Sequence, residues 1–226
     1  MARSATPGIL TEEQISLLKL FAQERYFTGR YYLTGGTPLA AFYLQHRHSE
    51  DLDFFTEKEE VDVMAVQQFV AHAKKTLRLT GISYKQYYGL HTFFLTFPGK
   101  RELKVDFNYY PFRQLEAPRR EMGVAVDSLK DIAVNKIQSI ATRTNARDFV
   151  DLFFISQQQP YPVHRLWQWA RAKFDWYVDP IQLGKQLLKA RELKDYPRMI
   201  KPLEKNEFIS YFETQAREIG KEVLAP

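Results

Sequence analysis

The chain has 226 residues, 32 Lys and Arg against 27 Asp and Glu, a formal net charge of +5, and no cysteine. Its length is enough for one large domain or two small ones, and 45% hydrophobic residues are typical of a globular protein. Without cysteine, disulfides, thiol nucleophiles and Cys-ligated zinc are excluded. No run of about eighteen apolar residues occurs, and no apolar stretch precedes the first acids, so we expect a cytoplasmic protein with no membrane span.

The charge is distributed unevenly. Residues 1–60 carry a net charge of −3, whereas residues 61–120 carry ten basic and four acidic side chains, a net charge of +6. An acidic block followed by a basic one favours a polyanionic partner, such as a nucleotide or RNA, beside a site built from carboxylates. A solvated basic surface explains the charge alone equally well.

The first half of the sequence predicts helices alternating with strands. Thr11 and Gln14 predict a capping box for a first helix, and residues 30–34 predict a short strand. Thr37 as N-cap and Pro38 in the first helical position predict a helix over residues 39–47. Further along we predict a strand over 51–55, a helix over 61–78, and an antiparallel meander of strands over 82–88, 90–97 and 102–109.

A short strand near residues 123–126 precedes a region that reads as helical to the end of the chain. The predicted fold is therefore α+β: a mixed sheet flanked by helices over residues 1–126, followed by a helical C-terminal region over residues 127–226.

Asp51 and Asp53 are the first candidate site residues. They lie two apart in a predicted strand, so both side chains project from one face while Leu52 and Phe54 point to the core. Two adjacent carboxylates repel each other unless a cation lies between them, and Mg²⁺ (or Mn²⁺) prefers such oxygen ligands. Taken alone, the pair is more often a solvent-facing feature at a strand end.

Two more features favour a metal and phosphate site. Gly35 and Gly36 lie in a strand–turn–helix, where backbone N–H groups can approach a phosphate closely and the helix dipole favours an anion. Asp106 shares one face of its predicted strand with Lys104. If that strand lies beside residues 51–55, the three aspartates form one cluster able to hold one or two metal ions.

Charged residues in the C-terminal region also require partners. Lys136 falls within the apolar stripe of a predicted helix, where it must either extend to the surface or meet an anion. Asp148 and Asp151 lie on one side of a strongly apolar helix, and Lys136 and Arg147 are their candidate partners. Asp148 can also be the third-position acid of a helix capped by Asn145, an explanation that does not extend to Asp151.

The stretch YYLTGGTPLAAFYLQHRHSEDLDFF resembles the opening motif of the DNA polymerase β-like nucleotidyltransferases, a Gly-Gly or Gly-Ser turn followed by D-x-D. More narrowly, G-G-T-x-L-A followed by R-x-S-x-D-L-D-F is similar to the AbiEii/AbiGii nucleotidyltransferase toxins of abortive-infection systems. Lys136 with Arg147-Asp148-x-x-Asp151 fits the second motif of that family. The fuller form of this motif begins with an Asp-Arg pair, where this chain has Thr144-Asn145.

The resemblance implies a polymerase β-like nucleotidyltransferase fold and metal-dependent transfer of a nucleoside monophosphate from an NTP to an acceptor hydroxyl. The implied acceptor is RNA, such as the 3′ end of a tRNA, and the implied protein partner is a cognate antitoxin. The region 127–226 is expected to contribute to the active site. The implied catalytic residues are Asp51, Asp53, Asp106, Lys136, Asp148 and Asp151, of which the first three bind the metal. The implied nucleotide-binding residues are Gly35, Gly36, Thr37, Arg47, Ser49 and Arg147.

Alternative interpretations stay open. A non-catalytic antitoxin or RNA-binding protein on the same fold would not need three acids and Lys136. A small-molecule nucleotidyltransferase of the antibiotic-resistance type would leave the basic block unexplained. His46 and His48 are a weak metal pair, since no third ligand follows with zinc-like spacing. The tyrosines of the meander, among them Tyr84, Tyr87 and Tyr88, can stack on bases or form cross-strand pairs.

Overall fold

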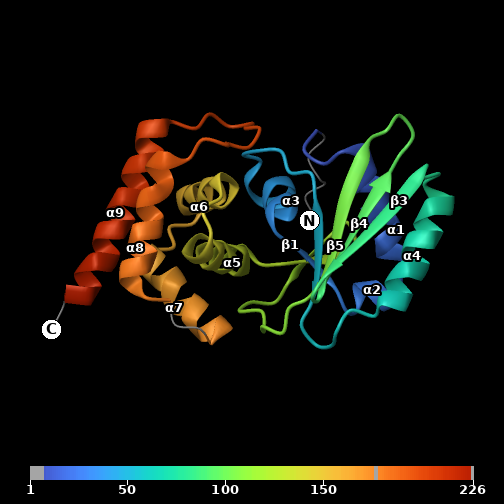
Figure 1. The fold of residues 1–226 in the computed structure, drawn as a ribbon, viewed down its shortest axis with the longest axis horizontal. Helices are drawn as coiled ribbons and strands as arrows, with labels where there is room; N and C mark the ends of the chain where they lie inside the picture. The colour runs from blue at the N-terminus through green and yellow to red at the C-terminus, as the bar shows by residue number, and fades with distance from the viewer. Residues whose placement is uncertain (1–7, 176–177, 225–226) are drawn as a thin grey trace. The chain divides into compact units, whose positions relative to one another are not determined.

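A computed structural model describes residues 8–175 and 178–224 (Figure 1). The chain divides into two compact units. Unit 1 comprises Met1–Tyr43 and Ser49–Ser128, and unit 2 comprises Leu44–His48 and Leu129–Pro226. Within the part that the structure describes, no helix is long and apolar enough to cross a membrane.

Unit 1 is built on a mixed seven-stranded sheet with the strand order β3-β4-β5-β2-β1-β7-β6. Pairs β2–β5 and β1–β7 are parallel and the other neighbours antiparallel, which confirms the predicted meander of β3, β4 and β5. The strands are β1 (Tyr32–Thr34), β2 (Leu52–Thr56), β3 (Gly81–Tyr87), β4 (Leu90–Thr96), β5 (Glu102–Tyr109), β6 (Arg119–Glu121) and β7 (Val124–Val126).

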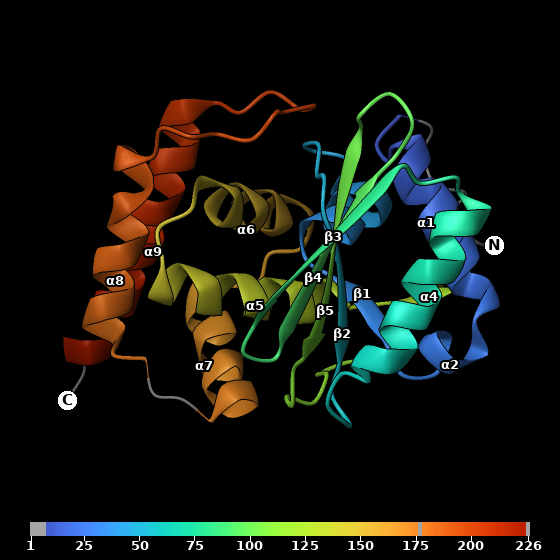
Figure 2. The ribbon, with the colours of Figure 1, turned by 45° about the vertical axis from the view of Figure 1, so that its right-hand side comes forward.

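Helices α1 (Glu12–Gln23) and α4 (Val63–Thr76) cover one face of this sheet, and the short α2 (Arg25–Thr28) follows α1 (Figures 1 and 2). The predicted capping box of Thr11 and Gln14 is confirmed at the start of α1. Phe21 of α1 stacks on Phe54 of β2, with ring centroids 4.1 Å apart. Because side chains alternate along β2, this packing leaves Asp53 on the opposite face.

The helix after the double glycine differs from the prediction. Gly35, not Thr37, precedes the first turn, α3 (Gly36–Pro38), which continues as a π-helical segment, η1 (Leu39–Leu44). The predicted N-cap was therefore wrong, and so was the helical assignment of residues 45–47. Gln45 has a φ of +54°, and the chain beyond it pairs through Arg47 with Met199 as an isolated β-bridge of unit 2.

Unit 2 is helical, as predicted for the C-terminal region. Its core is aromatic: Phe149 and Phe153 of α6 pack edge-on against Phe212 and Phe208 of α9. The helices are α5 (Leu129–Thr142), α6 (Ala146–Gln158), α7 (Val163–Phe174), α8 (Pro180–Leu188), the 3₁₀ turn η2 (Lys189–Glu192) and α9 (Lys205–Leu224).

Candidate active site

The double-glycine turn lies directly against the D-x-D strand. Gly35 has a φ of +86° and a ψ of −155°, a conformation that is essentially restricted to glycine. A Cβ atom added to Gly35 would lie 2.5 Å from Oδ2 of Asp53. The position therefore needs glycine for its backbone and for its space, and the absence of a side chain lets the Asp53 carboxylate approach the turn.

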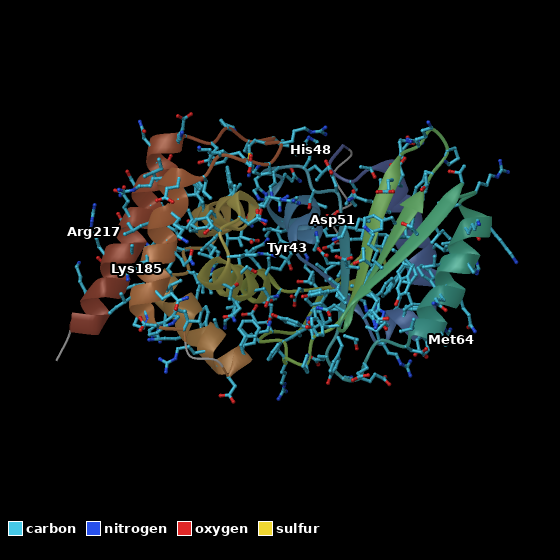
Figure 3. The ribbon with its side chains drawn as sticks, in the orientation of Figure 1. Tyr43, His48, Asp51, Met64, Lys185 and Arg217 are labelled. Atoms are coloured by element: carbon cyan, nitrogen blue, oxygen red, sulfur yellow. The ribbon has the colours of Figure 1, made fainter. Side chains whose placement is uncertain are left out.

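The strand register brings the candidate carboxylates to one face of the sheet. Asp53 of β2 pairs directly with Asp106 of the parallel neighbour β5. Leu52, Phe54 and the β5 residues between the polar positions are buried on the other face, as the alternation predicted. Asp51 lies just before β2 with its side chain partly exposed (Figure 3).

Lys104 contacts two of these acids and was not among the predicted site residues. Its ammonium lies 2.6 Å from Oδ2 of Asp106 and 3.7 Å from Oδ2 of Asp51. Thr92 of β4 donates a 2.6 Å hydrogen bond to the other oxygen of Asp106. Partial burial opposes the charge of Lys104, but its hydrogen bond to Asp106 and the charges of the aspartates raise its pKa above the ordinary value.

These residues match a divalent cation in the chemistry of their donors. Three carboxylates are hard oxygen ligands of the kind that Mg²⁺ binds. In the described part of the chain, however, no three acidic or histidine side chains converge tightly enough to hold a metal ion as they stand. The ammonium of Lys104 is the positive group that contacts Asp51 and Asp106, so a metal there would have to replace it.

Thr37, next to the same turn, makes a contact that stabilises the local structure. Its side chain is buried, and its hydroxyl donates to the backbone carbonyl of Asp51. This bond ties the turn to the residue that precedes β2. Thr34, the last residue of β1 before the turn, and Gln114 both donate to the buried carboxylate of Asp127, at 2.8 Å each. Asp127 was not predicted as part of this region.

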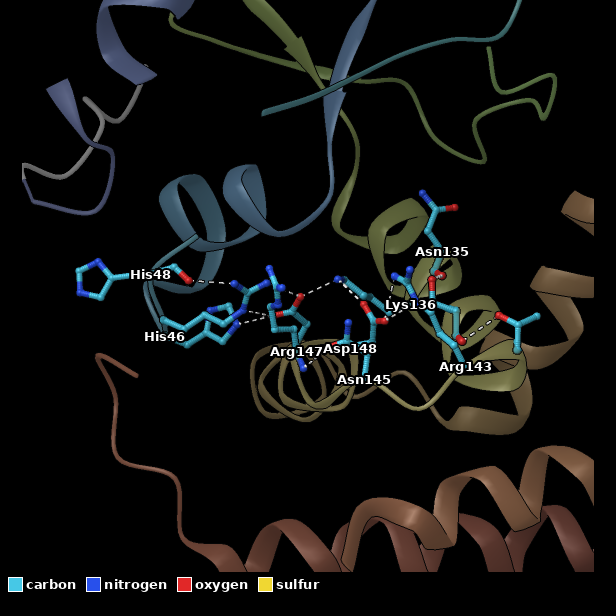
Figure 4. A network of polar contacts seen from close by, with 12 residues as sticks. His46, His48, Asn135, Lys136, Arg143, Asn145, Arg147 and Asp148 are labelled. Carbon is cyan, nitrogen blue, oxygen red and sulfur yellow. Dashed lines mark hydrogen bonds and ion pairs between the residues drawn. The ribbon is translucent and has the colours of Figure 1, made fainter. Parts of the chain in front are cut away.

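A second group of predicted residues meets inside unit 2 (Figure 4). The carboxylate of Asp151 is fully buried and accepts hydrogen bonds from Arg47 at 2.6 and 2.9 Å. The ammonium of Lys136 lies 2.7 Å from it, and Nε2 of His46 lies 2.8 Å from it. These contacts hold the pKa of Asp151 well below its usual range despite the opposing effect of burial.

Asp148 extends this group. It pairs with Lys136 at 2.8 Å and with Arg143 at 3.1 Å. Arg147, the other predicted partner, has an exposed side chain and contributes its backbone N–H to the capping side chain of Asn145. The expected meeting of Lys136 with the two aspartates is confirmed, whereas the pairing of Arg147 with them was wrong.

The segment Leu44–His48 is anchored by this network. Arg47 is 2% exposed, and it binds Asp151 together with the backbone carbonyl of His48. Burial lowers the pKa of His46 below its ordinary value, although Asp151 opposes this effect, so the ring is neutral at pH 7. Ser49, the next predicted residue, accepts a hydrogen bond on its backbone carbonyl from Gln14 of α1.

A glycine turn that touches a D-x-D carboxylate, with a third aspartate in register on the neighbouring strand of a mixed sheet, is the arrangement expected of a polymerase β-like nucleotidyltransferase. A family model, Nucleotidyl transferase AbiEii toxin, Type IV TA system, matches residues 18–217. The chain therefore belongs to the AbiEii nucleotidyltransferase toxin family, which confirms the predicted fold and enzyme class.

Individual relatives are more distant. The chain is 29% identical over 147 residues to the uncharacterized protein aq_aa25 of Aquifex aeolicus (strain VF5), a match over 64% of this chain and 66% of that protein. The crystal structure of JHP933 from Helicobacter pylori has a TM-score of 0.60 at 20% identity, covering 97% of this chain and 94% of that one. MenT4, the nucleotidyltransferase toxin Rv2826c from Mycobacterium tuberculosis H37Rv, has a TM-score of 0.54 at 15% identity, covering 92% and 81%.

Proposed function

We propose that this chain transfers a nucleoside monophosphate from an NTP to a hydroxyl group of RNA, such as the 3′ end of a tRNA, and that it acts as the toxin of a toxin–antitoxin pair. The observation that carries the proposal is the contact between the Gly35 turn and Asp53, with Asp106 in register. A triphosphate bound to the backbone N–H groups of this turn would lie beside the carboxylates. A cognate antitoxin protein is the proposed partner.

The proposed cofactor is Mg²⁺ or Mn²⁺, held by Asp51, Asp53 and Asp106. When bound, the ion would supply positive charge to the phosphate oxygens and polarise the acceptor hydroxyl. In the transfer itself, the acceptor oxygen bonds to the α-phosphorus while the bond to the bridging oxygen of the β-phosphate breaks, and pyrophosphate leaves. Asp106 takes the hydroxyl proton, and Gly35 and Gly36 hold the leaving phosphates.

Lys136, Asp148 and Asp151 enter the proposal as positioning residues. Their charges are satisfied by one another and by Arg47 and Arg143, at distances of 2.6 to 3.1 Å. Through Arg47 they fix the segment that leads along the chain to Asp51 and β2. Loss of this anchor would release the segment Leu44–His48 from the core of unit 2.

The decisive experiment incubates purified protein with Mg²⁺, each of the four labelled NTPs, and tRNA or protein acceptors. Wild-type protein should label the RNA, and Asp53→Ala should abolish labelling while keeping its melting temperature. Glu60→Ala, which removes an exposed acid of unit 1, is the matched control and should remain active. Undiminished transfer by Asp53→Ala would contradict the assignment of the site.

A further inference from the structure

The hairpin of β3 and β4 carries aromatic side chains that the packing of unit 1 does not use. Tyr87 and Tyr88 are 72% and 83% exposed, the highest values among the large exposed hydrophobic residues of the described chain. Their rings contact each other edge-on, with centroids 4.7 Å apart. Tyr84 behaves differently, because it packs on Phe93 across the strands. The cross-strand interpretation thus accounts for Tyr84 but not for the two tyrosines at the tip.

The backbone at the tip makes Tyr88 more unusual. Tyr87 pairs with Leu90, so Tyr88 and Gly89 form a two-residue loop. Tyr88 has a φ of +50°, in the left-handed region where glycine, asparagine and aspartate are favoured in hairpin loops. A bulky aromatic residue there is strained and, at 83% exposure, gains little from packing. Such a residue is expected where its ring serves binding rather than folding.

The register places one side of the hairpin on the same face as the carboxylates. A cross-strand row runs Lys85, Thr92, Asp106, Asp53, because each residue pairs with the next. Lys85 therefore lies two strands from Asp106, about 10 Å at the usual strand spacing. Tyr87, two residues along β3, shares this face, and the ammonium of Lys85 lies over the ring of half-buried Phe94 at 5.3 Å.

The sequence segment that contains the hairpin carries only positive charge. From Val63 to Arg101 the sequence contains six Lys or Arg residues and no Asp or Glu. The hairpin and the segments that flank it in the sequence are therefore basic, whereas the acids Glu102 and Asp106 lie on β5, the strand beside β4. A positively charged surface with exposed rings is the combination by which proteins hold single-stranded nucleic acid, since every base has a face that can stack.

We propose that the β3–β4 hairpin is a platform for the single-stranded end of the nucleic acid acceptor. Tyr87 and Tyr88 stack on unpaired bases, and Lys85 contacts the backbone phosphate between them and Asp106. The strand then runs along the sheet face toward the carboxylate row. This inference rests on the proposed function for the statement that the bound strand leads to the carboxylates. The binding surface itself can be tested without any transfer reaction.

The test measures binding of a fluorescent twelve-nucleotide RNA by anisotropy, without NTP or metal, beside a single-stranded DNA of the same sequence and a blunt RNA duplex. The two single strands should bind and the duplex, whose bases are already stacked, should bind more weakly. Replacing both tyrosines by alanine should weaken single-strand binding by about tenfold or more, because one stacked base contributes about 1–3 kcal/mol. Tyr87→Phe should retain binding and Tyr87→Leu should lose it, since only phenylalanine keeps the ring.

The contributions of charge and of base stacking to RNA affinity can be distinguished by measuring the affinity at several salt concentrations. Lys85→Gln should lower the slope of log affinity against log salt by about 0.7, the value for one phosphate of a single strand, whereas the tyrosine variants should leave it unchanged. Met64→Ala and Lys185→Gln are matched controls, because both side chains are exposed and belong to α4 and α8, outside the hairpin (both are labelled in Figure 3). Tyr88→Asn should weaken RNA binding but raise the melting temperature, because asparagine suits a positive φ. If Tyr88 served the fold alone, the same substitution would lower the melting temperature.

Absence of single-strand binding by wild-type protein overturns the inference, as do equal losses in the control variants. The inference is also overturned if the double alanine variant binds RNA as well as wild type does and the hairpin is needed instead for binding a protein partner. Normal transfer with an unchanged RNA KM in the hairpin variants would reject the platform and leave the nucleotidyltransferase intact. Hairpin-dependent RNA binding by a protein that transfers no nucleotide would support the platform and reject the proposed transfer activity.

Discussion

Replacing Lys104 by methionine tests whether its ammonium stands in for a metal ion among the carboxylates. Methionine keeps much of the length and the apolar stem but removes the charge. Asp106, whose side chain is 7% exposed, would lose a 2.6 Å bond to a charged donor, and Asp51 a weaker partner at 3.7 Å. Without a divalent ion, we therefore expect the variant to be less stable than wild type.

The size of the loss follows from these contacts. A hydrogen bond to a charged group contributes about 1.5–3 kcal/mol, and the 34% exposure of the Lys104 side chain reduces this through solvent screening to about 1–2 kcal/mol. For a chain of this length the melting temperature shifts by about 2–4 °C for each kcal/mol, so it should fall by about 2–8 °C in EDTA.

Metal binding should change in the opposite direction. Because the ammonium no longer competes for Asp51 and Asp106, Mn²⁺ affinity measured by EPR should rise by about five- to thirtyfold, which corresponds to the same 1–2 kcal/mol. Titration with Mg²⁺ should also restore more thermal stability to the variant than to wild type. Lys100→Met, an exposed lysine in the β4–β5 turn, is the control for loss of one charge. An unchanged melting temperature in EDTA, together with unchanged Mn²⁺ affinity, would refute the reasoning.

Three further predictions concern the turn and the buried network. Gly35→Ala should lower transfer by about a hundredfold, because the new Cβ would displace Asp53 from the turn, whereas Gly220→Ala, in open space, should leave the activity unchanged. Asp151→Asn should lower the free energy of unfolding by about 3–5 kcal/mol in urea titrations, since it removes the carboxylate that pairs with the buried guanidinium of Arg47, while Lys136 keeps Asp148; a loss below about 1 kcal/mol would contradict this. The lowered pKa of His46 means that the unfolded chain binds a proton near pH 6.5 while the folded chain does so only at lower pH, so stability should fall as the pH drops below about 6.5. His46→Gln should flatten this part of the stability profile, and a profile identical to that of wild type would contradict the assignment.

Much of the site could be predicted because its determinants are local. Alternation along a strand places Asp51 and Asp53 on one face wherever Leu52 and Phe54 are buried, and the same rule applies to Asp106. Asn145 caps α6 through a contact two residues away. These patterns act over a few residues and are visible in the sequence whatever the rest of the chain does.

The tertiary structure decided which of these local pieces meet. The register that pairs Asp53 with Asp106, and the approach of the Lys104 ammonium to Asp51, depend on how β2 and β5 associate across a large sequence separation. The choice of Arg47 as the main partner of Asp151 likewise joins residues 104 positions apart. Such contacts are set by burial of the whole core, so the types of residue in the sequence determined the chemistry of the site, and long-range packing determined its geometry.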